Sequence, residues 1–217
     1  NFYLESGLFY CNSYTLSVKG NWTNAPGVAA FIEGTGTVEL NGTGTQTLTT
    51  EWFNNLVLNK AGGTMSIPTG VTVHCNTYDW TAGAYSVSGG SFIVGDLIDG
   101  GIFGTITLSS GLIEYTQGSG QYIDLRATLT INGGTFNVYG GSGPAYFAYT
   151  DAATLNMSSG VLDFKSVGIY IPTTPVFTEN ITGGRIRTVL SFTNLRSDFT
   201  PTGGVLELYG TGDCTLQ

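Results

Sequence analysis

The stretch Thr128–Val138, TLTINGGTFNV, holds two short runs of alternating residues on either side of a glycine pair. Leu129 and Ile131 lie before the glycines, and Phe136 and Val138 lie after them. Successive side chains of a strand point to opposite faces, so each apolar pair faces one way and its polar neighbours face the other. The stretch therefore predicts two short strands that meet at a corner where glycine relieves the backbone.

Variants of this corner recur along the whole sequence. Aligned on the glycine, the copies lie 20 to 29 residues apart, with a mean interval of about 25 residues. A repeat of this length is typical of solenoids, in which each repeat is one structural unit stacked on the next. The nine aligned glycines are Gly7, Gly36, Gly63, Gly90, Gly111, Gly134, Gly160, Gly184 and Gly204.

The segments between corners leave room for a third strand. Residues 121–127 and 168–172 again alternate apolar and polar side chains, and no segment has a helical period. Three short strands in each of about nine coils of roughly 25 residues predict an all-β fold, a parallel β-helix or β-solenoid. A β-sandwich is the alternative, but its Asn-Gly and Asp-Gly turns do not occur at the required 8–12-residue spacing. We expect residues 1–217 to form a single solenoid domain.

Stacked coils predict columns of outward side chains. In the column formed by the third residue after each glycine, Arg187 would lie between Asp163 and Glu207. Two exposed ion pairs are expected there, each worth at most about 1 kcal/mol. A second column, before the glycine, carries hydroxyl and amide side chains that can hydrogen-bond along the ladder. Its members are Thr105/Thr107, Thr128/Thr130, Thr154/Asn156 and Thr178/Asn180.

The composition excludes several classes of function. Charged residues are 10% of the chain, the net charge is −8, and only seven residues are Lys or Arg. A nucleic-acid groove needs a positive stripe, and anionic membrane surfaces attract basic segments, so neither partner is expected. No apolar run reaches the roughly 18 residues that a membrane-spanning helix needs, so no membrane insertion is expected.

Few residues suggest bound metals or cofactors. Cys11, Cys75 and Cys214 are odd in number and far apart, with no CxxC pair and no zinc-type spacing to His74. They favour free thiols, with one long-range disulfide as the alternative. The calcium-binding motif of β-rolls is missing. The sequence therefore predicts no metal site and no cofactor.

Polysaccharide lyases and hydrolases also adopt β-helices, and they need clustered carboxylates. Asp96 and Asp99 flank glycines and are interpreted as turn residues. Asp124 and Arg126 lie on one strand face and predict an exposed ion pair, while His74 has no nearby Ser, Cys or Asp and is interpreted as structural. The sequence therefore predicts a protein without catalytic residues.

Trp22, Trp52 and Trp80 are the candidate ligand-binding residues, because aromatic faces suit carbohydrate ligands. Trp52 and Trp80 precede aligned glycines by 11 and 10 residues, so we expect them to stack on adjacent coils. The alternative is that the three indoles fill corners of the core.

The two ends of the sequence lack capping elements. Residues 209–216, YGTGDCTL, copy residues 41–48, NGTGTQTL, and neither end has an amphipathic helix or a polar terminal repeat. Bare parallel edges invite further strand pairing. They predict a fragment of a longer solenoid with open ends, which we favour, or coils that associate end to end.

Residues 20–67 contain the runs GNWTNAPG, GTGTVELNGTGTQTLTT and FNNLVLNKAGGTMSI, and TLTINGGTFNVYG follows at 128–140. These runs resemble the repeats of large β-helical, adhesin-like surface proteins of gliding and gut-type bacteria, which are cargo of a type IX secretion pathway. The resemblance implies an extracellular or cell-surface location and no assigned catalytic residues. The partners that we expect are surface glycans, other surface proteins, or further copies of the chain associated end to end.

Three hypotheses of function follow. The first is a non-catalytic structural or adhesive segment of a secreted or cell-surface protein: a stalk, an adhesin or a fibre component. The alternative is a carbohydrate-binding or carbohydrate-active β-helix. An ice-binding β-solenoid is a lesser alternative, because only two coils keep a strict Thr-x-Thr pattern and the apparent coil length varies.

Overall fold

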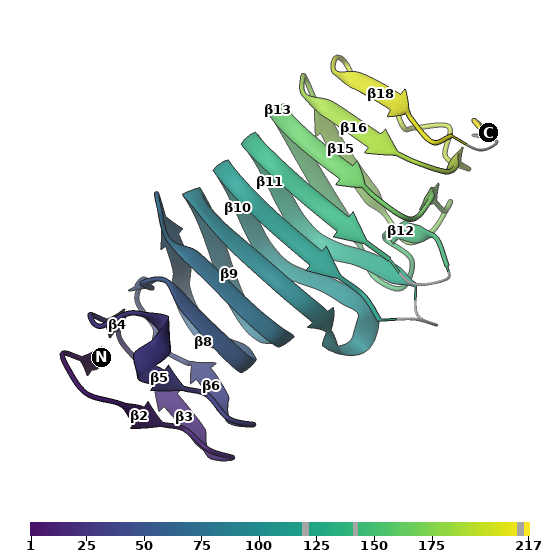
Figure 1. Cartoon of the computed structure of the whole chain (residues 1–217). Coiled ribbons are helices and arrows are strands. Elements are labelled where there is room, and N and C mark those ends of the chain that lie inside the picture. The colour runs from purple at the N-terminus through teal and green to yellow at the C-terminus, as the bar shows by residue number, and fades with distance from the viewer. Residues whose placement is uncertain (119–121, 141–142, 212–214) are drawn as a thin grey trace.

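The computed structural model describes residues 1–118, 122–140, 143–211 and 215–217. It is nearly all strand and forms a β-solenoid of about nine turns, which confirms the predicted fold class. The coils stack in one direction, so that the two termini lie at opposite ends (Figure 1). Among the described residues, the strands of every ladder pair in parallel.

Strands between tight turns account for most of the chain. The strands are β1 (Phe2–Leu4), β2 (Phe9–Tyr10), β3 (Thr15–Val18), β4 (Trp22–Asn24), β5 (Phe31–Ile32), β6 (Thr37–Leu40), β7 (Gln46–Thr47), β8 (Glu51–Pro68), β9 (Thr72–Leu97), β10 (Gly101–Thr116), β11 (Ile123–Tyr139), β12 (Ala145–Phe147), β13 (Ala153–Phe164), β14 (Ile169–Ile171), β15 (Phe177–Ile181), β16 (Arg185–Thr188), β17 (Phe192–Asn194) and β18 (Val205–Leu208). Two 3-10 turns, η1 (Val28–Ala30) and η2 (Ile98–Gly100), complete the described elements. No helix among the described residues is long and apolar enough to cross a membrane.

Equivalent legs of successive coils stack into three walls, and the longest strands bend around corners to join more than one wall. Wall 1 holds the legs before the glycine corner: 64–67, 84–87, 105–108, 128–131, 154–157 and 178–181. Wall 2 holds the legs after it: 51–53 and 73–75, then 91–94, 112–115, 135–138, 161–164, 185–188 and 205–208. Wall 3 holds the returning legs: 15–18, 37–40, 55–58 and 77–80, then 101–103, 123–126, 145–147, 169–171 and 192–194.

The register corrects the alignment of the first copies. The strand that follows Gly36 is β6, which lies in wall 3, and the leg that follows Gly63 lies in wall 1. From Gly90 onward, every aligned copy lies in wall 2 as expected. All three corners of a coil need the same tight turn between alternating strands, so the motif does not reveal which corner it occupies. Paired residues are accordingly 18 to 27 positions apart, as in Thr37 with Asn55 and Asn132 with Ser159.

Inward side chains form one continuous hydrophobic core along the stack. In wall 1, Leu129 and Leu155 are at most 1% exposed, and in wall 2 Phe136 is fully buried. Each such side chain contributes about 1.5–3 kcal/mol relative to an exposed position. The outward side chains therefore distinguish the three walls from one another.

Candidate functional surfaces

The structure does not bring the three tryptophans together. Trp22 is completely buried, and its indole Nε1 donates a hydrogen bond to the Glu51 carboxylate at 3.0 Å. Trp52 is 55% exposed and pairs with His74 in wall 2, whereas Trp80 pairs with Leu58 in wall 3. The expected stacking of Trp52 on Trp80 is therefore not found, and Trp22 offers no ring face to a ligand.

Trp80 instead forms a short stack in wall 3. Its ring lies parallel to that of Phe103, with the centroids 5.6 Å apart, and the Arg126 guanidinium lies 4.2 Å from the Phe103 centroid on the next coil. The Trp80 indole Nε1 donates to the Gly83 carbonyl at 3.0 Å. These contacts leave Trp80 half-buried and join three coils of wall 3.

The other residues considered for chemistry are dispersed. The predicted pair of Asp124 and Arg126 is present, at 3.3 Å, but the Asp124 side chain is fully buried rather than exposed. Asp96 lies near the end of strand β9 rather than in a turn, and it accepts a hydrogen bond from the Gly118 amide of the next coil. The side chain of Asp99 lies outside what the structure describes. In the described part of the chain, no group of three or more His, Cys, Asp or Glu side chains could hold a metal ion.

Cys11 and Cys75 are buried free thiols, and Cys214 lies outside the described residues. Burial raises the pKa of both thiols, which keeps them in the protonated, unreactive form.

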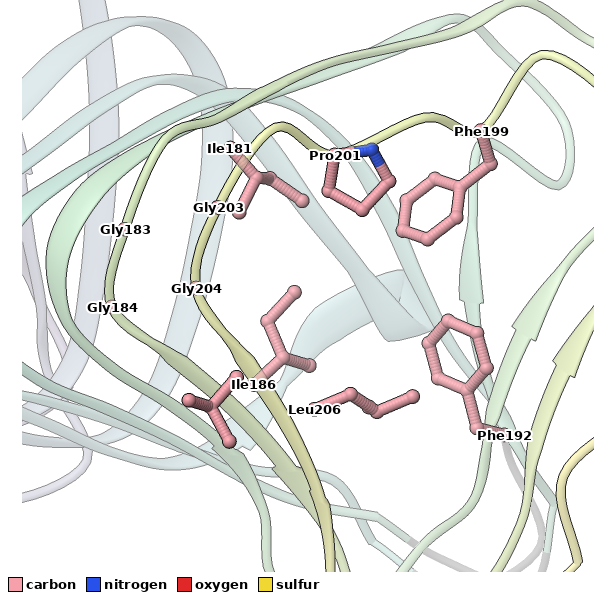
Figure 2. A pocket seen from close by; sticks show the side chains of 11 residues that line it. Ile181, Gly183, Gly184, Ile186, Phe192, Phe199, Pro201, Gly203, Gly204 and Leu206 are labelled. Carbon is pink, nitrogen blue, oxygen red and sulfur yellow. The ribbon is translucent and has the colours of Figure 1, made fainter.

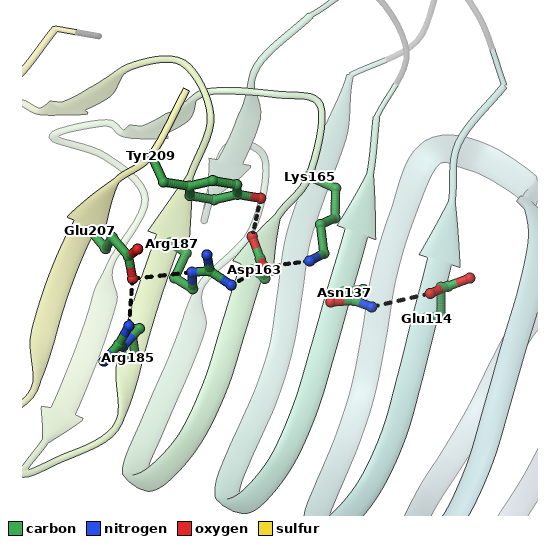
Figure 3. Close-up of polar contacts among 8 residues, drawn as sticks. All are labelled: Glu114, Asn137, Asp163, Lys165, Arg185, Arg187, Glu207 and Tyr209. Atoms are coloured by element: carbon green, nitrogen blue, oxygen red, sulfur yellow. Dashed lines mark hydrogen bonds and ion pairs between the residues drawn. The ribbon is translucent and has the colours of Figure 1, made fainter. Parts of the chain in front are cut away.

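Wall 2 carries a charged cluster centred on Asp163 (Figure 3). Arg187 lies between Asp163 and Glu207, at 3.0 Å and 3.2 Å, which confirms the predicted order of this column. Lys165 contacts the same Asp163 carboxylate at 2.7 Å. The Asp163 side chain is fully buried, so the pair that it forms with Arg187 is not the exposed ion pair expected from the sequence.

Tyr209 covers this cluster from the last coils. Its hydroxyl donates to Asp163 at 2.7 Å, and the Arg187 guanidinium lies 4.2 Å from its ring centroid. Burial, together with the hydrogen bond to the Asp163 carboxylate, raises the pKa of Tyr209 to about 12. A tyrosine with so high a pKa stays protonated at neutral pH, so Tyr209 acts here as a hydrogen-bond donor that joins the coils.

Wall 1 presents a face of hydroxyl and amide groups. The predicted columns are confirmed: Thr105, Thr128, Thr154 and Thr178 stack directly on one another. The register also adds members that the sequence alignment missed, because Thr64 stacks below Ala84 and Ser66 below Ser86. No member of these two columns carries a charge between residues 64 and 180.

Wall 3 carries a cluster of tyrosines that the sequence did not reveal. The ring centroids of Tyr122 and Tyr146 are 5.3 Å apart, as are those of Tyr146 and Tyr170 on the next coil. Tyr149 completes the cluster, 4.4 Å from Tyr146 and 5.2 Å from Tyr122. Tyr122 and Tyr149 remain 42% and 44% exposed. We call these four residues the tyrosine platform.

Two features hold Tyr149 against the platform. The buried Asp124 carboxylate accepts hydrogen bonds from the Tyr149 amide at 3.0 Å, and from the Thr150 amide and hydroxyl at 3.1 and 2.9 Å. Ala148 has a φ of +57°, a conformation that non-glycine residues rarely adopt. The neighbouring Phe147 is anchored in the core, so the chain turns sharply outward and presents Tyr149 to the surface.

Lys60 is a buried cation that pairs with no carboxylate among the described residues. Its ammonium group donates to the carbonyls of Gly42 and Gly44 at 2.7 and 2.9 Å, and to the side-chain oxygen of Gln46 at 2.6 Å. Burial lowers its pKa. All three donors are used to close the corner at residues 42–46, so Lys60 is a structural group and is not poised as a nucleophile.

An apolar pocket lies at the last coils and has a volume of about 140 Å³ (Figure 2). Ile181, Ile186, Phe192, Phe199 and Leu206 line it, together with Pro201, Val205 and the paired glycines of two corners. The pocket is thus the end of the hydrophobic core. Its described lining contains no charged side chain, hydroxyl or thiol that could act on a ligand.

The tyrosine platform, Lys60 and the buried state of Asp163 escaped sequence reasoning for one reason. The position of each group depends on a turn or on a third leg of the coil. The neighbours of these segments are determined by the pairing register, which the sequence pattern does not reveal. A sequence signal did exist for the platform: Tyr146, Tyr149 and Tyr170 fall in or beside third-leg segments, 24 residues apart in the case of Tyr146 and Tyr170. No family model, curated protein or solved structure matches this chain.

Proposed function

We propose that this chain is a non-catalytic structural and adhesive segment of a secreted or cell-surface protein. The observation that carries the proposal is the uninterrupted architecture: parallel backbone ladders and one hydrophobic core run through all the described coils. Long-range pairing of every coil with its neighbours makes a stiff, extended body. Each coil adds about 4.8 Å along the axis, and the sides of the rod remain free to carry ligands or partners.

The charge pattern agrees with such a role. Ion pairs such as Arg187 with Asp163 and Arg185 with Glu207 join neighbouring coils of wall 2. The described residues contain no candidate metal cluster, and the two described thiols are buried. Low charge and short turns leave little that proteases can reach in an extracellular setting.

The proposal is tested by location and shape together. Antibodies against the purified chain are expected to label intact cells that produce the protein, and small-angle scattering of the purified chain is expected to give the profile of an elongated particle. Labelling that needs permeabilised cells would argue against the surface role. A spherical scattering profile, or release of sugars from polysaccharides by the chain, would contradict a non-catalytic rod.

Ice binding is a second candidate, favoured by the register of wall 1. Coil lengths vary, but the extra residues lie outside the wall, so Thr105, Thr128 and Thr154 remain in unbroken register. Threonine side chains are stiff at χ1, so the hydroxyl groups form a fixed array. Ala84 and Asn156 interrupt this array, which is why we rank the candidate second.

Thermal hysteresis of the purified chain tests this candidate. The variant Thr128→Lys/Thr130→Lys places charges in the middle of the wall 1 array and is expected to abolish any hysteresis. Thr135→Lys, on the same strand β11 but in wall 2, is the matched control and is expected to keep it. Absence of hysteresis in the wild-type chain excludes the candidate.

A further inference from the structure

We propose that the tyrosine platform of wall 3 binds a neutral saccharide chain laid along the solenoid axis. This inference rests on the adhesive role proposed above and gives that role a ligand class and a location. The platform is formed by Tyr122, Tyr146, Tyr149 and Tyr170, and it lies on three successive coils.

The ring chemistry supports a saccharide. A sugar has apolar C–H faces and a rim of hydroxyl groups, and a tyrosine offers an apolar ring with a polar tip. The ring centroids of Tyr122, Tyr146 and Tyr170 follow one another in 5.3 Å steps, close to the spacing of successive coils. Neighbouring rings are inclined by 80° and 63°, so a saccharide chain laid along the axis would meet ring edges as well as ring faces. Contiguous exposed apolar surface marks interaction sites, and Tyr122 and Tyr149 provide the exposed part of this cluster.

The wall itself does not need rings at this position. The same outward column begins with Gly101, continues through Asp124, Tyr146 and Tyr170, and ends with Thr193. Thr193 pairs in parallel with Tyr170 and carries no aromatic ring, so the coil geometry alone does not require a tyrosine in this column. The position of Gly101 is covered by the Phe103 ring.

The platform is held in place by groups that cost folding energy. Asp124 is a fully buried carboxylate that accepts three hydrogen bonds from Tyr149 and Thr150. Ala148 adopts a left-handed conformation directly before Tyr149. Strained backbone and buried charge are retained where the surrounding structure needs a fixed geometry, as in a preorganised binding surface.

Charge selects a neutral ligand over an acidic one. The chain carries a net charge of −8, and Asp151, beside the platform, is exposed. Arg126, which lies two residues after Asp124 on the same strand, is already paired with Asp124 and Asp151. A polyanionic polysaccharide would meet repulsion without a free counter-charge, whereas a neutral chain would not.

Affinity electrophoresis through gels that contain xyloglucan, galactomannan or mixed-linkage β-glucan tests the proposal, with polygalacturonate as the acidic comparison. The wild-type chain is expected to be retarded in at least one neutral gel and not in polygalacturonate. Tyr122→Ala/Tyr149→Ala is expected to weaken the retardation about tenfold or more, as for rings that carry much of the binding energy. Tyr14→Ala, which removes a 73% exposed tyrosine at the other end of the solenoid, is the matched control and is expected to bind like the wild type.

Circular dichroism and small-angle scattering of the same samples separate the two proposals. An elongated, folded wild-type chain that passes every neutral gel unretarded overturns the saccharide site and leaves the rod intact. A chain that is not elongated overturns the rod.

The single variants Tyr122→Ala and Tyr149→Ala decide the question if the double variant does not fold. Weakened retardation of a folded single variant supports the saccharide site, and unchanged retardation of both single variants refutes it. Retardation only in the polygalacturonate gel also refutes the saccharide site, because it would show binding of an acidic polysaccharide instead of a neutral one.

Discussion

The guanidinium of Arg187 lies 3.0 Å from the carboxylate of Asp163, whose side chain is completely buried between coils. Removing one partner of a buried pair leaves the other charge without full compensation. Because Lys165 still contacts Asp163, we expect Arg187→Met to lower the free energy of unfolding by roughly 1–3 kcal/mol, measured by urea denaturation.

Arg185 provides the matched control for this prediction. It occupies the same strand β16, pairs with Glu207 at 2.8 Å and has a side chain that is 50% exposed. Exposed ion pairs contribute little, so Arg185→Met should cost less than about 1 kcal/mol. Equal losses in the two variants would show that burial of Asp163 does not set the strength of the cluster.

The pairing of Arg187 with Asp163 was predictable from the sequence, but the burial of Asp163 was not. Alternation and the glycine period define the coil and the order of residues in each column from Gly90 onward. They do not define which corner a glycine occupies, as Gly36 and Gly63 illustrate. Lys165 and Tyr209, which cover Asp163, lie just beyond the ends of their strands, where side-chain direction does not follow strand alternation.

The same limit explains the candidate ligand surfaces. The three candidate ligand-binding residues, Trp22, Trp52 and Trp80, are predicted from residue type alone. Whether each indole is buried or exposed depends on its position in the coil. Trp22 lies on an inward position of β4 and is buried, whereas Trp52 lies on an outward position of β8. The tyrosine platform depends on the turn at Ala148, and no local sequence rule predicts a left-handed alanine.

Glu51 gives the fold a pH dependence. Burial raises the pKa of its carboxyl above the ordinary value of 4.5, although hydrogen bonds from Asn24 and Trp22 act in the opposite direction. Between that value and the raised one, the folded state binds more protons than the unfolded state, so stability rises as the pH falls through this window. The difference in free energy of unfolding, wild type minus Glu51→Gln, should therefore grow as the pH is lowered from 7 towards 4.5.

Glu39 supplies a control of opposite sign. Hydrogen bonds from Ser17 and Asn59 lower the pKa of its carboxyl, so the stability that it contributes is present above the ordinary value of 4.5 and is lost as the pH falls below it. The corresponding difference for Glu39→Gln should shrink below pH 4.5. Differences that stay constant with pH in urea titrations of both variants would contradict these assignments.

Lys60 should be essential to the corner that it closes. Lys60→Met keeps a similar length but leaves the carbonyls of Gly42 and Gly44 and the Gln46 oxygen without their donor. Buried acceptors without partners are costly, so we expect a loss of about 2–4 kcal/mol in urea denaturation. Lys19→Met replaces an exposed lysine and should change stability by no more than about 0.5 kcal/mol. A loss for Lys60→Met as small as that of the control would show that water replaces the ammonium group.

Gly134, in the stretch that defines the repeat, should tolerate no side chain. Its φ is +73°, and a β-carbon there would lie 2.6 Å from the Gly111 carbonyl oxygen of the preceding coil. The left-handed conformation alone costs an alanine about 1–2 kcal/mol, and the overlap with fixed backbone adds to it, so Gly134→Ala should lose at least about 2 kcal/mol. Gly44→Ala is the matched control, because a β-carbon at Gly44 meets no atom within 4 Å. Thermal unfolding of the two variants measures the difference, and equal midpoints would mean that neighbouring coils can separate locally without loss of stability.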